Sequence, residues 1–257
     1  MNKELSGFSK GEIIDYRQWT ENEFSITVKA SIGPYVAGQF TKLALKDEDG
    51  NWLRRAYSFV NSPNHSLGKD HMEFLIIDVP SGGLSPKLAQ LHLGDEIYVG
   101  DKPSGFMTLN EIPDTVTNLW LLSTGTAIGP FLSLLAEDEC QQRFKYIVLV
   151  HAVRTRQELV YPELIANLQQ VYAGKLSFLP IVSREKHQDI ISGRIPNLLK
   201  DGSLMQSVKL TPNKQSSFFY LCGNPAMVHD TRDVLLELGF DKHLRRSPGQ
   251  FSFENYW

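Results

Sequence analysis

The stretch Leu119-Trp120-Leu121-Leu122-Ser123-Thr124-Gly125-Thr126-Ala127-Ile128-Gly129-Pro130 joins an apolar run to a glycine turn, and residues 131–139 continue it as a helix. A short apolar run that passes through a tight turn into a helix is typical of a buried strand in a parallel sheet. Gly125 and Gly129 lack the GxGxxG spacing of the dinucleotide fingerprint, so the turn alone also fits any tight strand-to-helix connection. The stretch therefore predicts an α/β unit.

The pattern differs between the two halves of the chain. Further apolar runs separated by stretches of helical periodicity lie at residues 146–150, 176–182 and 218–221. In the N-terminal half, short β-type runs alternate with turn signals at residues 24–29, 39–45, 73–79 and 96–99, a rhythm that suits an antiparallel barrel. We therefore expect two domains, an antiparallel β-barrel over residues 1–109 and an α/β domain with a parallel sheet over residues 110–257.

Composition excludes several classes of function. The net charge of −3 gives no electrostatic argument for nucleic acid, and no apolar run approaches the roughly 20 residues of a membrane helix. The N-terminus has no apolar segment of the kind found in signal peptides, so we expect a cytoplasmic protein. Cys140 and Cys222 form no CxxC cluster, so neither a disulfide framework nor a metal or iron–sulfur site is expected.

Arg55-Ala56-Tyr57-Ser58 has the chemistry of a flavin site. A guanidinium offers a planar fork to pyrophosphate oxygens, and a tyrosine two residues later shares its face of the strand and can cover an isoalloxazine ring. Ser58 then points the other way, where its hydroxyl could hydrogen-bond the flavin N5. The four residues alone fit equally well an ordinary strand with a solvated arginine.

A possible phosphate site follows at Gly82-Gly83-Leu84-Ser85-Pro86, before residues 87–91. Ser85 suits a helix N-cap and Pro86 the first helical position, which would leave free N–H groups for an anion. The glycines let phosphate oxygens approach the backbone. A plain capped helix has the same pattern.

The end of the second apolar run favours NADP(H) over NAD(H). Arg154 follows Val153, where an acidic residue would bind a ribose 2′-hydroxyl. Arg154, Ser183-Arg184 and Gly193-Arg194 instead supply guanidinium groups and a hydroxyl suited to a 2′-phosphate. We interpret Arg156 as a solvated surface charge.

Cys222-Gly223-Asn224-Pro225 follows the last apolar run, and the carboxyl end of a parallel strand faces the ligand crevice of such sheets. Cys222 could line a nicotinamide pocket and Gly223 could admit the ribose-phosphate backbone. A buried structural cysteine is the alternative.

Taken together, these motifs resemble bacterial ferredoxin/flavodoxin–NADP+ reductases, in particular the subclass that ends in Tyr-Trp. The resemblance covers nearly the whole chain and rests on Arg55–Ser58, Gly125–Pro130, Ser183-Arg184, Cys222–Pro225, Lys242-His243-Leu244-Arg245-Arg246 and Tyr256-Trp257. It implies an FAD-binding six-stranded antiparallel barrel followed by an NADP-binding α/β domain with a tail that covers the flavin.

The resemblance also implies site residues. For FAD they are Arg55, Ala56, Tyr57, Ser58, Leu75, Ile76, Ile77, Gly83, Leu84, Ser85, Thr126, Tyr256 and Trp257. For NADP(H) they are Val153, Arg154, Ser183, Arg184, Arg194, Gly223 and Asn224. Tyr256 would cover the flavin face opposite Tyr57, so that nicotinamide must displace it, and Trp257 would stack on the adenine; a packed surface anchor is the other interpretation of this pair.

The implied reaction is hydride transfer from NADPH to FAD N5, followed by two one-electron transfers to ferredoxin or flavodoxin. Ser58 would polarise N5, Glu254 would relay a proton and Cys222 would position the nicotinamide. Lys242, Arg245 and Arg246 would dock the acidic carrier, or form a merely solvated surface. We expect a monomer. The rival functions are a free-flavin or ferric reductase, which the tail aromatics would hinder, and a non-catalytic FAD sensor, which would not need the nucleotide site.

Overall fold

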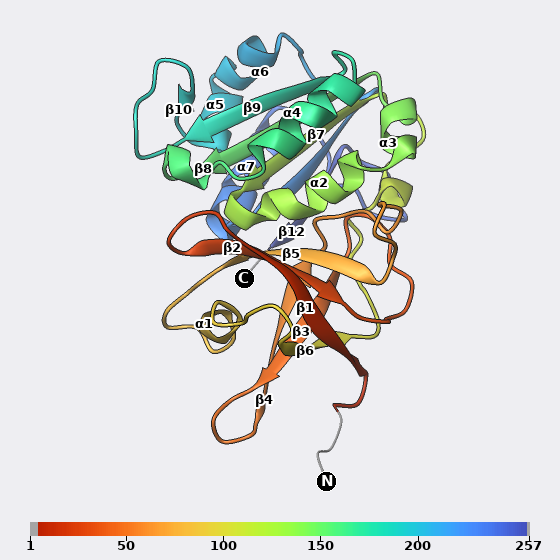
Figure 1. Cartoon of the computed structure of the whole chain (residues 1–257). Coiled ribbons are helices and arrows are strands. Elements are labelled where there is room, and N and C mark those ends of the chain that lie inside the picture. Colours follow the sequence, from red (N-terminus) through yellow and green to blue (C-terminus); the bar gives the residue numbers. More distant parts are fainter. Residues whose placement is uncertain (1–4, 256–257) are drawn as a thin grey trace.

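The computed structural model describes residues 5–255, which form two stacked halves with a six-stranded sheet in each (Figure 1). None of the helices in this range is long and apolar enough to cross a membrane. The first sheet ends at Gly100 and the second begins at Asn118, so the connecting residues 101–117 contain the domain boundary that we propose at 109/110.

The first sheet is antiparallel throughout, with the strand order β4-β3-β6-β1-β2-β5. Its strands are β1 (Phe8–Gln18), β2 (Glu23–Lys29), β3 (Phe40–Lys46), β4 (Trp52–Ser58), β5 (His71–Ile77) and β6 (Glu96–Gly100). An antiparallel bridge between Phe59 and Phe74 joins the two edges, and both rings are fully buried among the inward-facing side chains. The sheet therefore closes into a barrel around its own core.

The second sheet is parallel throughout, with the order β10-β9-β8-β7-β11-β12. Its strands are β7 (Asn118–Thr124), β8 (Tyr146–Val153), β9 (Leu176–Val182), β10 (Ile191–Ser192), β11 (Ser217–Gly223) and β12 (Phe251–Asn255). β8, β9 and β10 follow one another outward on one side of β7, whereas β11 and β12 lie on its other side, so the strand order reverses there. Ligands of such sheets bind beyond the carboxyl ends of the strands at the reversal, here β7 and β11.

Helices cover both faces of the parallel sheet (Figure 1). The helices α2 (Gly129–Leu135), α3 (Asp138–Arg143) and α4 (Pro162–Val171) pack on one face, and α5 (Ile195–Lys200), α6 (Ser203–Val208) and α7 (Pro225–Glu237) pack on the other. Leu119 and Leu121 of β7 belong to the first core, whereas Trp120 and Leu122 belong to the second. Because both faces are covered, β7, β8, β9 and β11 each contain a run of apolar residues that point to either face, which is the pattern that predicted them.

The predicted helix over residues 131–139 is wrong in extent, because the chain breaks between α2 and α3. Glu137 has extended backbone angles (φ −86°, ψ 131°), and its carboxylate accepts hydrogen bonds from Ser62 and from the Asn64 side chain of the barrel half. The contact between the halves therefore interrupts the helix. The remaining short elements are α1 (Ser85–Leu88), η1 (Leu109–Glu111), η2 (Gly125–Ile128) and η3 (Arg156–Glu158).

The two halves are also joined by polar and aromatic contacts. The Tyr161 hydroxyl donates to the Glu73 carboxylate at 2.6 Å, and the Trp19 ring packs on Tyr161 with the ring centroids 4.5 Å apart. The Ser133 hydroxyl donates to the Asn61 carbonyl at 2.9 Å. These contacts hold the barrel against the face of the parallel sheet that α2 and α4 cover.

Candidate functional site

A cleft of about 350 Å³ lies between the barrel and the parallel sheet. Its walls come from β4, β5, the segment before α1, η2 and β12. The lining residues are Phe40, Arg55, Ala56, Tyr57, Ser58, Leu75, Ile77, Val79, Gly82, Gly83, Leu84, Ser85, Thr126, Glu254 and Asn255. Segments that are as far apart in sequence as residues 55 and 254 thus meet around one space.

Most of the predicted flavin residues are in this lining. Ile76 is the exception: its side chain is 1% exposed and packs in the barrel core, because neighbouring residues of a strand point to opposite faces. Leu75 and Ile77 therefore face the cleft on either side of it. Tyr256 and Trp257 lie outside the described residues.

Arg55, Tyr57 and Ser58 give the cleft one polar wall. No carboxylate among residues 5–255 pairs with the exposed Arg55 guanidinium, and no described residue hydrogen-bonds the Ser58 hydroxyl. Burial raises the pKa of Tyr57 to about 12, so its half-buried ring stays neutral. The wall thus offers a cation, an aromatic face and a hydroxyl within four residues.

The predicted N-cap at Ser85 is wrong, because Leu84 occupies the N-cap position and Ser85 is the first helical residue of α1. The Ser85 hydroxyl instead accepts a hydrogen bond from the Val79 N–H at 3.1 Å and closes the turn before the helix. Around Gly83 the nearest atoms to an added Cβ would be those of Leu53, at 3.7 Å and beyond. The backbone at Gly83 is therefore open to an approaching phosphate, although α1 itself has only four residues.

Glu254 brings a carboxyl group to the cleft from β12. Its Oε1 accepts the Phe106 N–H at 2.9 Å, and burial raises the pKa of the carboxyl despite the hydrogen bonds from the Phe106 and Met107 N–H groups. A carboxyl whose pKa is raised keeps its proton more readily than an ordinary glutamate, which suits a group that exchanges protons. Cys222 lies opposite it in the β11–β12 ladder, is 0% exposed, and has a thiol pKa raised well above the ordinary value by burial. The structure thus places this neutral thiol behind the wall of the cleft rather than in its lining.

The ends of β7 and β11 approach each other closely. Thr124 Oγ1 accepts the Asn224 N–H at 2.9 Å, and a Cβ at Gly223 would lie only 2.1 Å from Thr124 Oγ1. Gly223 also has φ +130°, so glycine is required here. The Asn224 side chain accepts the N–H groups of Ala226 and Met227 and caps α7, so in this structure it acts as a helix cap.

Sequence reasoning missed a residue that supports the glycine turn. His151 is 0% exposed, and its Nε2–H donates to the Gly125 carbonyl at 3.1 Å. Burial lowers the pKa of the imidazole to about 4, so it is neutral at physiological pH. The signal was a histidine inside an otherwise apolar strand, which needs a buried hydrogen-bond partner.

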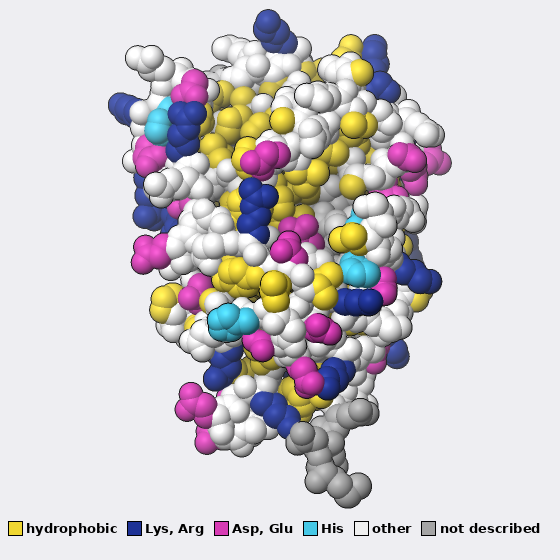
Figure 2. All heavy atoms as spheres, in the orientation of Figure 1, with side chains coloured by type: hydrophobic (Ala, Val, Ile, Leu, Met, Phe, Trp, Pro, Cys, Tyr) yellow, Lys and Arg dark blue, Asp and Glu magenta, His cyan; other side chains and the backbone are white. Residues whose placement is uncertain are grey.

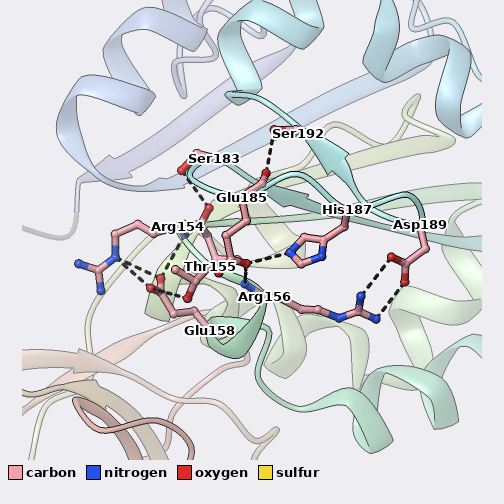
Figure 3. A network of polar contacts seen from close by, with 10 residues as sticks. Arg154, Thr155, Arg156, Glu158, Ser183, Glu185, His187, Asp189 and Ser192 are labelled. Atoms are coloured by element: carbon pink, nitrogen blue, oxygen red, sulfur yellow. Dashed lines mark hydrogen bonds and ion pairs between the residues drawn. The ribbon is translucent and has the colours of Figure 1, made fainter.

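Arg154 follows the end of β8, Ser183 and Arg184 follow the end of β9, and Arg194 is the N-cap of α5. Figure 3 shows Arg154 and Ser183 beside each other. Arg154 uses its Nε to donate to both oxygens of Glu158, at 3.1 and 3.2 Å. The Arg184 N–H donates to the Arg154 carbonyl at 2.9 Å, which joins the two strand ends. Val153 is 4% exposed, so its side chain is in the core while its carbonyl accepts from Ser183.

Arg156 is a surface charge, as predicted, with its side chain 54% exposed, but it also has a partner that the sequence did not indicate. Its two terminal amino groups donate to the two oxygens of Asp189, at 3.1 and 2.9 Å. The Arg156 charge therefore has a carboxylate partner within the protein itself.

The predicted basic cluster lies near β12. Arg245 forms an ion pair with Glu111 at 2.8 Å and lies over the Phe106 ring at 4.4 Å from its centroid. Lys242 lies 4.4 Å from the centroid of the Phe253 ring, and Arg246 is exposed. Phe106 itself is 62% exposed, so the cluster combines cations with an exposed aromatic ring.

Known proteins resemble both the sequence and the fold. Residues 121–233 match the family model of the oxidoreductase NAD-binding domain. The flavodoxin/ferredoxin–NADP reductase of Escherichia coli (strain K12) is 46% identical over 254 residues, which covers 98% of this chain and 100% of that protein. The enzyme of the same name from Buchnera aphidicola subsp. Baizongia pistaciae is 45% identical over 247 residues, 96% of this chain and 97% of the relative. A crystal structure of a ferredoxin NADP+ reductase from Neisseria gonorrhoeae with bound FAD and NADP superposes with a TM-score of 0.90 at 31% identity and covers 98% of this chain and 100% of that one.

Proposed function

The chain belongs to the flavodoxin/ferredoxin–NADP reductase family, and we propose that its cleft holds FAD while the strand ends beside the cleft hold NADP(H). Members of this family are oxidoreductases that transfer electrons between NADPH and ferredoxin or flavodoxin. The observation that carries the assignment of the site is the convergence of β4, β5, η2 and β12 on one cleft, because these elements bring the predicted flavin residues together.

The residues of the cleft fit a flavin dinucleotide. The Arg55 guanidinium, which no carboxylate of residues 5–255 pairs with, can compensate pyrophosphate charge, and the open backbone at Gly83 can admit the phosphate oxygens. The Tyr57 ring can cover one face of the isoalloxazine. When bound, FAD accepts a hydride at N5 and releases electrons singly, which no side chain of the protein can do.

Two side chains have roles in the chemistry itself. The Ser58 hydroxyl has no described partner and lines the cleft, which supports a hydrogen bond from it to N5 of a bound flavin. Glu254 also lines the cleft and has a raised pKa, which supports a role in exchanging the proton that accompanies reduction. Cys222 contributes from behind the wall, by fixing the position of the strand end that carries Gly223.

The nucleotide side is proposed from the arginines at the strand ends. Arg184 and Arg194 are exposed, and neither forms an ion pair within residues 5–255. Together with Arg154 and the Ser183 hydroxyl they suit a 2′-phosphate, which distinguishes NADPH from NADH. Thr126 lines the cleft and Gly223 ends β11, both at the reversal of the strand order, where nicotinamide would meet the flavin.

A docking surface for the electron carrier is proposed over Lys242, Arg245 and Arg246 with Phe106 and Leu244, of which the last two are 62% and 53% exposed. An exposed apolar patch beside cations fits an acidic partner, since the charges steer the encounter and the apolar contact holds it. The monomeric state stays a prediction. The cytoplasmic location stays a prediction.

The substitution Arg184→Ala tests the nucleotide assignment. Losing one charge-assisted hydrogen bond costs ~1.5–3 kcal/mol, which is about ten- to a hundredfold in affinity. We expect the KM for NADPH to rise by that factor while the KM for NADH hardly changes. Arg232→Ala is the matched control, because Arg232 is an arginine of the same half that pairs with Asp233 on α7. An equal loss for both nucleotides would remove Arg184 from the 2′-phosphate site.

A further inference from the structure

Residues 183–194, which link β9 to α5, carry three of the proposed phosphate ligands, with Ser183 and Arg184 at one end and Arg194 at the other. None of the side chains from residue 183 to residue 190 is buried. In the space-filling view, basic, acidic and histidine side chains gather over this segment at the upper left (Figure 2). The conformation of residues 183–190 therefore depends on polar contacts, whereas Ile191 near the other end of the segment packs against the core and pairs with β9.

Three residues supply those contacts, and we call them the clasp: Arg156 of η3, Glu185 and Asp189 (Figure 3). The Arg156 guanidinium donates to both Asp189 oxygens at 3.1 and 2.9 Å, and the Arg156 N–H donates to Glu185 Oε2 at 2.8 Å. The fork geometry fixes orientation as well as distance. The clasp therefore ties the middle of the segment to the loop after β8.

Glu185 is held from several sides. His187 Nε2 lies 2.8 Å from its Oε2, and the Ser192 hydroxyl donates to its carbonyl at 3.0 Å. The Arg156 N–H, followed by the His187 contact, lowers the pKa of the Glu185 carboxyl, which is thus ionised at neutral pH. The contact to Ser192 brings the two arms of the segment together just before Arg194.

The arginines of this region divide into two kinds. Both terminal amino groups of Arg156 donate hydrogen bonds to Asp189. Arg154 uses Nε on Glu158, and within residues 5–255 no carboxylate is described against its terminal amino groups, nor against Arg184 or Arg194. One guanidinium is thus committed to holding the segment, while three are left for a ligand.

We propose that the clasp positions Arg184 and Arg194 beside Arg154 in the absence of ligand and so sets the preference for NADPH; this rests on the proposed function. Arg156, Glu185 and Asp189 are positioning residues in this proposal and do not touch the nucleotide. If the binding-competent conformation of a site is populated only part of the time, the apparent affinity for the ligand falls by that fraction. A segment that already has the binding conformation therefore binds the 2′-phosphate more tightly.

Asp189→Asn separates positioning from simple electrostatics because the two effects have opposite signs. The substitution removes a negative charge near a phosphate site and releases the Arg156 guanidinium. If charge alone mattered, a 2′-phosphate would bind more tightly. If the clasp positions the segment, the phosphate should bind more weakly, by roughly two- to fivefold for an exposed bidentate ion pair.

The experiment measures the affinity of the FAD-loaded full chain for 2′,5′-ADP and the KM and kcat for NADPH and NADH. Glu237→Gln is the matched control: it breaks the Lys200–Glu237 pair, whose partners are 64% and 59% exposed against 54% and 60% for Arg156 and Asp189. We expect Asp189→Asn to weaken 2′,5′-ADP and raise the KM for NADPH, with the KM for NADH, kcat and FAD content unchanged. Arg156→Gln added to Asp189→Asn should cause little further loss.

Tighter or unchanged binding of 2′,5′-ADP by Asp189→Asn would overturn the clasp. If Arg184→Ala weakens 2′,5′-ADP in the same assay, that failure concerns the clasp alone and the nucleotide assignment stands. If Arg184→Ala also leaves the affinity unchanged, both the phosphate site and the role of the clasp in it are wrong.

Discussion

Replacing Glu23 by glutamine is expected to make the protein less sensitive to alkaline pH. Glu23 lies on β2 and is 4% exposed, and within residues 5–255 its Oε1 has no hydrogen-bond partner. Burial raises the pKa of its carboxyl from 4.5 to about 8; Glu158 raises it further, and Arg154 lowers it. The carboxyl is therefore protonated in the folded protein at neutral pH.

The magnitude follows from the two pKa values. Between 4.5 and about 8 the unfolded chain loses the Glu23 proton while the folded chain keeps it. Raising the pH therefore favours unfolding, by about 1.4 kcal/mol for each pH unit, and the loss levels off once the folded protein ionises as well. Below the lower value both states are protonated, so the contribution of Glu23 to stability is constant there. Glutamine cannot ionise, so the variant lacks this slope.

The assay is urea unfolding of the FAD-saturated protein at several pH values from 5 to 9, followed by fluorescence. The free energy of unfolding of the wild type should fall relative to Glu23→Gln as the pH rises, with the widest gap at about pH 8 and above. Glu21→Gln is the control, since Glu21 is exposed two residues earlier and should follow the wild type. Parallel curves for Glu23→Gln and the wild type would refute the reasoning, because they would mean that Glu23 is ionised in the folded protein.

Two further predictions concern the cleft and the strand ends. Ser58→Ala should retain FAD but slow its reduction by NADPH about two- to tenfold, since one hydrogen bond is worth roughly 0.5–1.5 kcal/mol; wild-type stopped-flow rates would show that Ser58 does not act on N5. Gly223→Ala should cost about 1–3 kcal/mol of stability in thermal unfolding and raise the KM for NADPH. The reason is that the added Cβ would lie 2.1 Å from Thr124 Oγ1. Gly202→Ala is the control, because Gly202 also has a positive φ but has no atom within 4 Å of an added Cβ, so this variant measures the backbone strain alone. Equal losses of stability in both variants would argue against the close approach at Gly223.

Much of the fold could be predicted from the sequence, because the hydrophobic periodicity and the turn residues agree with the observed strands. The strands predicted at residues 24–29, 39–45, 73–79 and 96–99 lie within two residues of β2, β3, β5 and β6. By contrast, β1 was not predicted, because a register shift between Ile13 and Asp15 breaks its alternation. The two-residue strand β10 and the mixed sequence of β12 carry too little pattern to recognise.

The residues of the candidate site could be predicted where they lie on one strand. Arg55 and Tyr57 share one face of β4 and both line the cleft, and Ser58 joins them at the end of the strand. The pairing of Arg156 with Asp189 could not be predicted from the sequence. The two residues are 33 positions apart, and both lie in connections between strands and helices, which have no hydrophobic periodicity. For the same reason the break at Glu137, which depends on a contact to the other half, was invisible in the sequence.

We propose that this chain passes electrons from NADPH through a flavin in the cleft to a carrier protein. The most direct measurement is the flavin absorbance of the FAD-loaded protein, without oxygen, on mixing with NADPH and then with oxidised flavodoxin. We predict that NADPH bleaches the flavin, that NADH does so far less well, and that flavodoxin restores the absorbance at a rate that falls with added salt. A flavin that NADPH does not bleach, or a bleached flavin that reoxidises with free flavin but not with flavodoxin, would contradict electron transfer from NADPH to a carrier protein.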